Sequence, residues 1–148
     1  MDKNFFIIGG FAGGSRVNSV RSASFTLPSS LVWTTVRAGE KPSKTFPIER
    51  NAHSAVAQGN SIFVFGGQDE DNNKLGDLWE FNVTTKQWAQ INFQNVTQGA
   101  EITRSGHAAV AYGSKMYIFG GILEVTKELN DLLIYDFKTQ RMLVHDQK

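Results

Sequence analysis

RNAHSAVAQGNSIFVFGG, residues 50–67, decides the fold, because residues 104–121 repeat it as RSGHAAVAYGSKMYIFGG. The two copies lie 54 residues apart and share one histidine and one pair of glycines: His53, Gly66 and Gly67 in the first copy, and His107, Gly120 and Gly121 in the second. Self-similarity at a period of about 20–50 residues, or slightly more, is typical of repeat architectures. We therefore expect a series of similar units rather than one irregular core.

The composition places the chain among globular proteins and excludes several classes of function. Of its 148 residues, 41% are hydrophobic and 20% are charged, and the net charge is +1 with acids and bases mixed. This balance predicts neither nucleic-acid nor membrane binding. The absence of cysteine excludes disulfides, thiolate metal sites and a cysteine nucleophile. With no signal-peptide core and no apolar run of about 20 residues, we expect a cytoplasmic protein.

Short runs of β-branched and aromatic residues alternate with turn residues throughout the chain, which predicts an all-β fold with almost no helix. The predicted strands are 4–10, 22–27 and 31–36 in a first repeat, 53–57, 62–65, 77–83 and 88–91 in a second, and 108–111, 116–119, 131–137 and 142–144 in a third. The first repeat, residues 4–36, lacks its first strand. Residues 50–92 and 104–144 form two complete repeats.

Four antiparallel strands per repeat form a small twisted sheet that is apolar on both faces, so neighbouring sheets must stack. Radial stacking of such sheets produces the β-propeller, which typically has about four to eight blades. This chain holds about two and two-thirds repeats. We therefore expect the remaining blades to come from a longer chain or from self-association.

These residues resemble the kelch repeat, whose pattern is Arg-x-x-His, an apolar strand ending in Gly-Gly, an Asp-Leu block with an aromatic residue, and Thr-x-x-Trp. The second repeat carries Arg50, His53, Gly66, Gly67, Asp77, Phe81 and Trp88; the third carries Arg104, His107, Gly120, Gly121, Asp131 and Tyr135, with Met142 in place of tryptophan; the partial repeat keeps Gly9, Gly10 and Trp33. The resemblance implies a partial kelch β-propeller of four-stranded antiparallel blades.

We interpret these motif residues as structural. Paired glycines permit positive φ and leave room for an aromatic ring from the same or a neighbouring blade. Phe81 and Trp88 suit the space between blades, and the two aspartates can accept hydrogen bonds from backbone donors at a strand start. The two histidines read as repeated buried anchors rather than as metal ligands, because nothing marks a third ligand.

Three other patterns do not predict sites. Residues 9–15, GGFAGGS, lack the lysine of a phosphate-binding loop, and no helix follows them. The acidic run 69–71 lacks the spacing of an EF-hand and reads as a solvated hairpin tip. The glycosylation sequons at Asn82 and Asn95 read as coincidence without an export signal. We expect no metal and no cofactor.

Loop lengths predict where a partner would bind. In an up-and-down sheet with strands a to d, the a–b and c–d turns share one side, and the b–c and d–a connections share the other. The first set is short here, whereas the second set is long, at 11–21, 68–76 and 122–130 for b–c and at 37–50 and 92–104 for d–a. The candidate partner-binding residues are Arg16, Arg21, Lys44, Asp69, Glu70, Asp71, Glu124 and Lys127.

The leading functional hypothesis is a protein-interaction module, a substrate adaptor or a scaffold, that presents these long connections to a protein partner. The alternative is part of a kelch-like propeller enzyme of the oxidase, mutarotase or specifier-protein type, whose active residues lie largely outside this chain. The absence of cysteine argues against the tyrosine–cysteine cofactor of the oxidases, and no Glu-x3-Asp-x3-His run is present. We expect a non-enzymatic protein.

Overall fold

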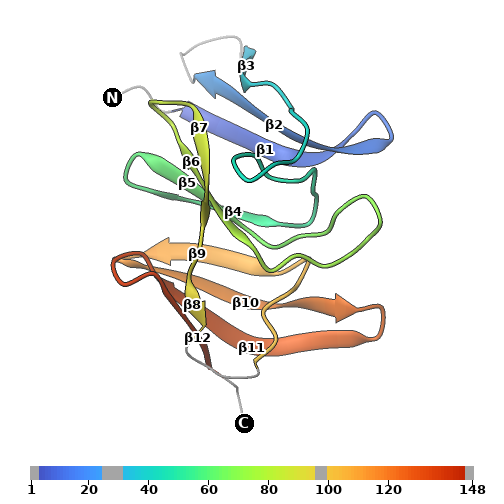
Figure 1. The fold of residues 1–148 in the computed structure, drawn as a ribbon, viewed down its shortest axis with the longest axis vertical. Coiled ribbons are helices and arrows are strands. Elements are labelled where there is room, and N and C mark those ends of the chain that lie inside the picture. The colour runs from blue at the N-terminus through green and yellow to red at the C-terminus, as the bar shows by residue number, and fades with distance from the viewer. Residues whose placement is uncertain (1–3, 25–31, 96–99, 146–148) are drawn as a thin grey trace.

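The computed structural model describes residues 4–24, 32–95 and 100–145, which form three small sheets stacked along the long axis of the molecule (Figure 1). The first sheet contains β1 (Asn4–Ala12), β2 (Ser15–Ser24) and β3 (Trp33–Arg37). The second contains β4 (Ser54–Gln58), β5 (Ser61–Phe65), β6 (Leu78–Asn82) and β7 (Gln87–Ile91). The third contains β9 (Ala108–Tyr112), β10 (Lys115–Glu124), β11 (Lys127–Asp136) and β12 (Arg141–His145). We call these sheets the first, second and third blades.

Consecutive strands within each blade pair antiparallel, and no described residue is helical, as the strand pattern predicted. The third blade gains a short fifth strand, β8 (Gln94–Asn95), which pairs parallel with β12. This strand lies within residues 92–104, which were predicted to be only a connection. The chain leaving the second blade is thereby attached to the outer strand of the third.

The predicted loops 11–21 and 122–130 are wrong, because both segments are largely strand. β1 and β2 pair from Asn4↔Ser24 to Ala12↔Ser15, which leaves only Gly13 and Gly14 as the turn. Both glycines have positive φ, at 62° and 88°, as two-residue hairpin turns require. In the third blade β10 and β11 pair as far as Glu124↔Lys127. Residues 25–27 and 31 of the predicted first-repeat strands lie outside the described residues.

The second blade keeps a true loop between β5 and β6, as predicted, and the three b–c connections lie on the same side of the stack (Figure 1). The two extended hairpins and this loop therefore form one edge of the molecule. We call this edge, together with the d–a connections, the long-connection side. The turns at 59–60, 83–86, 113–114 and 137–140 lie on the opposite side.

Apolar side chains fill the two spaces between the blades. All five residues of β5 are buried, because successive side chains point to opposite faces and each face is covered by a neighbouring blade. Ile62 and Val64 pack with Trp79, Phe81 and Trp88 toward the first blade. On the other face, the cluster against the third blade consists of Val56, Phe63, Phe65, Leu78, Met116, Ile118, Leu133, Tyr135, Met142 and Val144. This confirms that Phe81 and Trp88 fill the space between blades.

Candidate functional site

Each complete repeat contains an arginine–aspartate pair whose arginine is buried. The guanidinium of Arg104 donates two hydrogen bonds to the carboxylate of Asp131, at 2.7 and 3.0 Å, and a third to the carbonyl of Gly120 at 3.0 Å. Arg50 repeats this arrangement with Asp77, at 2.6 and 2.8 Å, and with a glycine carbonyl at 3.0 Å. The bidentate fork joins the start of the repeat to its third strand.

The two aspartates were expected to accept hydrogen bonds from backbone donors; in the structure each also accepts two from the arginine of its own repeat. Burial alone would raise the pKa of Asp77, but the hydrogen bonds and charge of Arg50 outweigh it and hold that pKa below its ordinary value. Asp77 also accepts a hydrogen bond from the indole Nε1 of Trp79 at 2.6 Å. Sequence reasoning missed the pair because the arginine and the aspartate are 27 residues apart.

The glycine pairs connect successive blades. The amide of Gly67 donates to the carbonyl of Arg104 in the following blade at 2.9 Å, and that of Gly10 donates to the carbonyl of Arg50 at 2.8 Å. A Cβ atom built on Gly66 would lie 2.8 Å from the carbonyl oxygen of Arg104 and 3.0 Å from Cε1 of His107. Each glycine pair thus forms a recess, here called the glycine socket, that accepts the Arg-Xaa-Xaa-His segment of the next blade.

Each histidine occupies the same position in its repeat because it packs into a glycine socket of the preceding blade. His53 lies against Gly9 of the first socket, where a Cβ would meet its Cε1 at 3.0 Å. His107 lies against the second socket, its Nε2 is 2.8 Å from the hydroxyl of Ser54, and its ring meets Phe65 edge-on at 5.5 Å. The aromatic ring expected beside the glycines is therefore the histidine of the neighbouring blade.

Both histidines are neutral at pH 7. Burial, followed by the charge of Arg50, lowers the pKa of His53 to about 4. Burial, followed by the charges of Arg104 and His53, lowers the pKa of His107 to about 4 as well. An imidazolium in either socket would be desolvated and would lie near an arginine, so protonation opposes the packing between blades.

Acidification is therefore expected to destabilise the chain before its carboxylates titrate. The unfolded state binds protons near pH 6.5 and the folded state only near pH 4, so stability is complete above the higher value and falls below it. Between pH 7 and 5.5 the loss is about 1 kcal/mol per histidine. Urea unfolding at these two pH values measures this loss of stability. His107→Gln should remove about half of the pH dependence, and an unchanged dependence would contradict this assignment.

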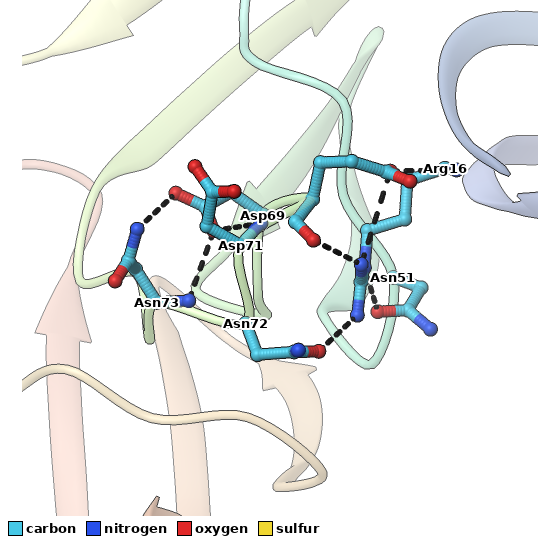
Figure 2. A network of polar contacts seen from close by, with 7 residues as sticks. Arg16, Asn51, Asp69, Asp71, Asn72 and Asn73 are labelled. Atoms are coloured by element: carbon cyan, nitrogen blue, oxygen red, sulfur yellow. Dashed lines mark hydrogen bonds and ion pairs between the residues drawn. The ribbon is translucent and has the colours of Figure 1, made fainter.

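A polar network joins the first blade to the loop of the second (Figure 2). In this network Arg16, on β2, donates from Nε to Asn51 at 2.8 Å, from Nη2 to Asn72 at 2.6 Å, and from Nη1 to the carbonyl of Glu70 at 3.1 Å. Its backbone amide donates to the carboxylate of Glu70 at 3.0 Å. The Arg16 side chain is only 8% exposed, so it links the two blades on the long-connection side.

The carboxylate of Asp69 holds the same loop together through hydrogen bonds within the loop. Its Oδ1 accepts the backbone amides of Asp71 and Asn73 at 3.0 and 2.9 Å, and its Oδ2 accepts Nδ2 of Asn73 at 3.0 Å. Asn72 adopts a positive φ of 64°, which asparagine tolerates better than most residues. The predicted solvated tip is correct for the exposed Glu70 and Asp71, but wrong for Asp69, which is buried.

The structure separates the eight candidate binding residues into three groups. Arg16 and Asp69 are engaged inside the network. Arg21, placed in a loop by the sequence, lies within β2 opposite Ile7 and Thr35, away from the hairpin tip. The other five candidates are exposed residues of the b–c and d–a connections: Lys44, Glu70, Asp71, Glu124 and Lys127. Glu124 and Lys127 face each other across the β10–β11 turn rather than lying in a long loop.

Three asparagines outside the eight candidate binding residues support this side. Asn51 and Asn72 accept hydrogen bonds from Arg16, and buried Asn18 donates to the carbonyls of Glu40 and Pro47 at 2.8 and 2.9 Å. Asn18 thereby attaches the 37–50 connection to β2. The Asn72-Asn73 pair after an acidic run is a turn signal that could have indicated a structured loop. Nothing local marks Asn18 or Asn51.

The described residues contain no group of three histidine, cysteine, aspartate or glutamate side chains that could hold a metal ion. Across the same residues, no helix is long and apolar enough to cross a membrane.

Stacked antiparallel blades, joined by a glycine socket and an Arg-Xaa-Xaa-His segment at each interface, define a repeat protein of the β-propeller type. Residues 1–147 match the family model described as the KLHDC2/KLHL20/DRC7 Kelch-repeats domain. The chain therefore belongs to the kelch-repeat family.

Curated relatives are much longer than this chain. It is 32% identical over 137 residues to the tRNA wybutosine-synthesizing protein 2/3/4 of Arabidopsis thaliana, a match that covers 92% of this chain and 13% of that protein. It is 29% identical over 122 residues to Kelch domain-containing protein 3 of Bos taurus, covering 78% of this chain and 31% of the relative. The Host cell factor homolog hcf-1 of Caenorhabditis elegans is 35% identical over 99 residues, 64% of this chain and 12% of that protein. The chain thus spans less than a third of each of these relatives.

Proposed function

We propose that this chain is a protein-binding module, serving as an adaptor or scaffold part of a longer protein, and that it presents its long-connection side to a protein partner. One observation carries the proposal: exposed charged side chains of both signs lie on connections that the fold holds in place. Asp71 is exposed on the second-blade loop beside Glu70, whose carboxylate also accepts the amide of Arg16. Glu124 and Lys127 are exposed at the end of the third-blade hairpin.

Rigid support favours binding because less conformational entropy is lost when a partner associates. The hydrogen bonds of Arg16 and Asp69 keep the acidic loop in one conformation. The β10–β11 hairpin is held by a ladder that runs from Lys115↔Asp136 to Glu124↔Lys127, with register shifts after Phe119 and after Ile122. The opposite side, in contrast, offers short turns with little surface beyond the sheets.

The packing of the two histidines between blades explains their recurrence without a catalytic role. His53 and His107 are neutral and packed into glycine sockets, so their occurrence in each repeat has a structural reason. A catalytic role for the parent protein would need residues from other parts of it. Metal analysis of the intact protein distinguishes the two proposals, because stoichiometric iron or copper would favour the enzyme.

The binding proposal is tested by reversing charges on the long-connection side. Asp71→Lys, Glu124→Lys and Lys127→Glu are combined in the intact protein, and partners are compared by affinity capture and mass spectrometry. A control variant reverses the charges of Lys86 and Lys138, which are exposed on the short turns of the opposite side. We expect the first variant to lose partners that the control retains. Identical partner sets for wild type and both variants would exclude this side as the binding surface.

A further inference from the structure

The outer strand of the third blade accepts a strand from another part of the chain. β8, Gln94–Asn95, runs parallel to the first two residues of β12. The amide of Gln94 donates to the carbonyl of Gln140, in the turn that precedes β12, at 3.0 Å. The outer edge of this blade therefore binds an extended segment through its backbone.

The second blade offers the corresponding acceptor, but no described residue bonds to it. Lys86 and Gln140 occupy corresponding turns, with φ values of 58° and 54°. Their amides donate to the carbonyls of Asn82 and Asp136, at 2.8 and 2.9 Å. Within the part of the chain that the structure describes, the carbonyl of Lys86 accepts no hydrogen bond, and β7 pairs only with β6. β7 therefore keeps an open edge where β12 is covered.

β7 lacks the features that usually prevent a sheet edge from pairing with another strand. Those features are charged side chains, lysine above all, together with prolines and bulges. Residues 87–91, QWAQI, include no charged residue and no proline, and their pairing with β6 has no register shift. The exposed side chains of Gln87, Ala89 and Gln90 are uncharged. A regular edge of this kind is a template for a further strand.

Alternate residues of β7 direct their backbone groups toward this open edge. Because the carbonyl of Gln140 faces β8, the corresponding carbonyl of Lys86 faces outward from β7. Along an antiparallel pair, every second residue bonds to the partner strand and the residues between face the opposite edge. The next outward residues are therefore Trp88 and Gln90.

We propose that β7 binds an extended segment of a protein partner, which adds to the second blade as a parallel fifth strand. One amide of that segment donates to the carbonyl of Lys86, and its carbonyls accept the amides of Trp88 and Gln90. Because the site recognises peptide backbone, the segment has no proline at the positions that donate. The site is the outer strand of a blade rather than its connections, so it does not depend on the function proposed above.

Two other occupants fit this edge less well. The 37–50 connection leaves the first blade as residues 92–104 leave the second, but Asn18 binds the carbonyl of Glu40 at 2.8 Å, and Pro42 has no amide proton to donate. Two copies of β7 related by a two-fold axis would pair antiparallel, because the staggered hydrogen bonds of a parallel pair need different residues on the two strands. The β8–β12 pair is parallel, which favours a segment of a different protein.

The test follows the amide signals of the isotope-labelled 148-residue chain by NMR while a synthetic peptide of residues 91–98, INFQNVTQ, is added. This peptide contains the sequence of β8. We expect the signals of Trp88 and Gln90 to shift and to reach saturation. A matched peptide with an N-methyl group at the residue corresponding to Gln94 cannot donate to the carbonyl of Lys86, so it should leave both signals unchanged.

A substitution in the protein tests the same contact from the other side. Gln90→Pro removes one outward amide, a change that an edge strand tolerates, and should weaken peptide binding by about tenfold, the equivalent of one lost hydrogen bond. Urea unfolding checks that the variant is folded. If it is not, Gln90→Lys takes its place, because a lysine on an edge strand opposes pairing.

Unchanged signals of Trp88 and Gln90, or equal shifts with both peptides, would overturn the proposal. Shifts confined to Arg141 and Met142 would show that the peptide only exchanges with β8, and would overturn it as well. Signals of β7 that shift with protein concentration in the absence of peptide would identify a second copy as the occupant, which also contradicts the proposal.

Discussion

Arg104→Ala is expected to lower the free energy of unfolding by about 3–5 kcal/mol, because it leaves a buried carboxylate without its counter-charge. Arg104 is 0% exposed and the side chain of Asp131 only 12%, so water cannot replace the guanidinium. The substitution also removes the donors that serve the carbonyls of Gly120 and Glu101. Domains of this size have a total stability of about 5–15 kcal/mol, so urea unfolding should show a large shift of the midpoint.

Two comparisons distinguish charge desolvation from a simple loss of packing. Arg50→Ala should cost less, because the side chain of Asp77 is 24% exposed and water can solvate it in part. The double variant Arg104→Met with Asp131→Leu should be more stable than Arg104→Ala, since no buried charge remains. A double variant as unstable as the single one would show that packing, not the unpaired carboxylate, dominates the loss.

Gly66→Ala is expected to cost about 3 kcal/mol, made up of the strain of a left-handed residue and the obstruction of a filled socket. Gly66 has a φ of 63°, and its new Cβ would lie 2.8 Å from a backbone oxygen, an atom that cannot move away as the end of a side chain can. The second and third blades would have to separate. Urea unfolding and hydrogen exchange of the amide of Gly67 measure this effect.

Gly113→Ala is the matched control for this substitution. Gly113 has a φ of 60°, but a Cβ there meets no atom within 4 Å. It should therefore show only the backbone strain, about 1–2 kcal/mol. If both substitutions cost the same, the contact between Gly66 and the following blade would contribute nothing to stability.

Much of the fold could be predicted because the repeat and the strands are both visible as patterns in the sequence. The recurrence of His53 as His107 defined the repeat, and the alternation of apolar residues marked the strands. The connections between strands were harder to predict. Residues 11–21 looked like a loop because they are rich in glycine and serine, yet only Gly13 and Gly14 turn the chain. The residues on either side of these glycines form strands because they can pair with each other. The composition of the segment alone does not show that pairing.

The candidate site was predicted as a region but not residue by residue. That the b–c connections share one side of the stack followed from topology (Figure 1). Five candidates on the b–c and d–a connections are exposed: Lys44, Glu70, Asp71, Glu124 and Lys127. Arg16 resembled any other charged residue in a polar segment. Its partners Glu70 and Asn72 lie 54 and 56 residues away, so only the folded chain shows that it links two blades.

The sequence by itself determined the all-β class, the repeat period and the residues that recur at each interface between blades, because hydrophobic periodicity and motif spacing are properties of neighbouring residues. Only the tertiary structure decided how far the hairpins extend, that Arg50 and Arg104 pair with aspartates, and which candidate side chains remain exposed. These features depend on which distant segments meet when the sheets stack. The recurrence of arginine and aspartate every 54 residues marks these residues, but it does not show which side chains they contact.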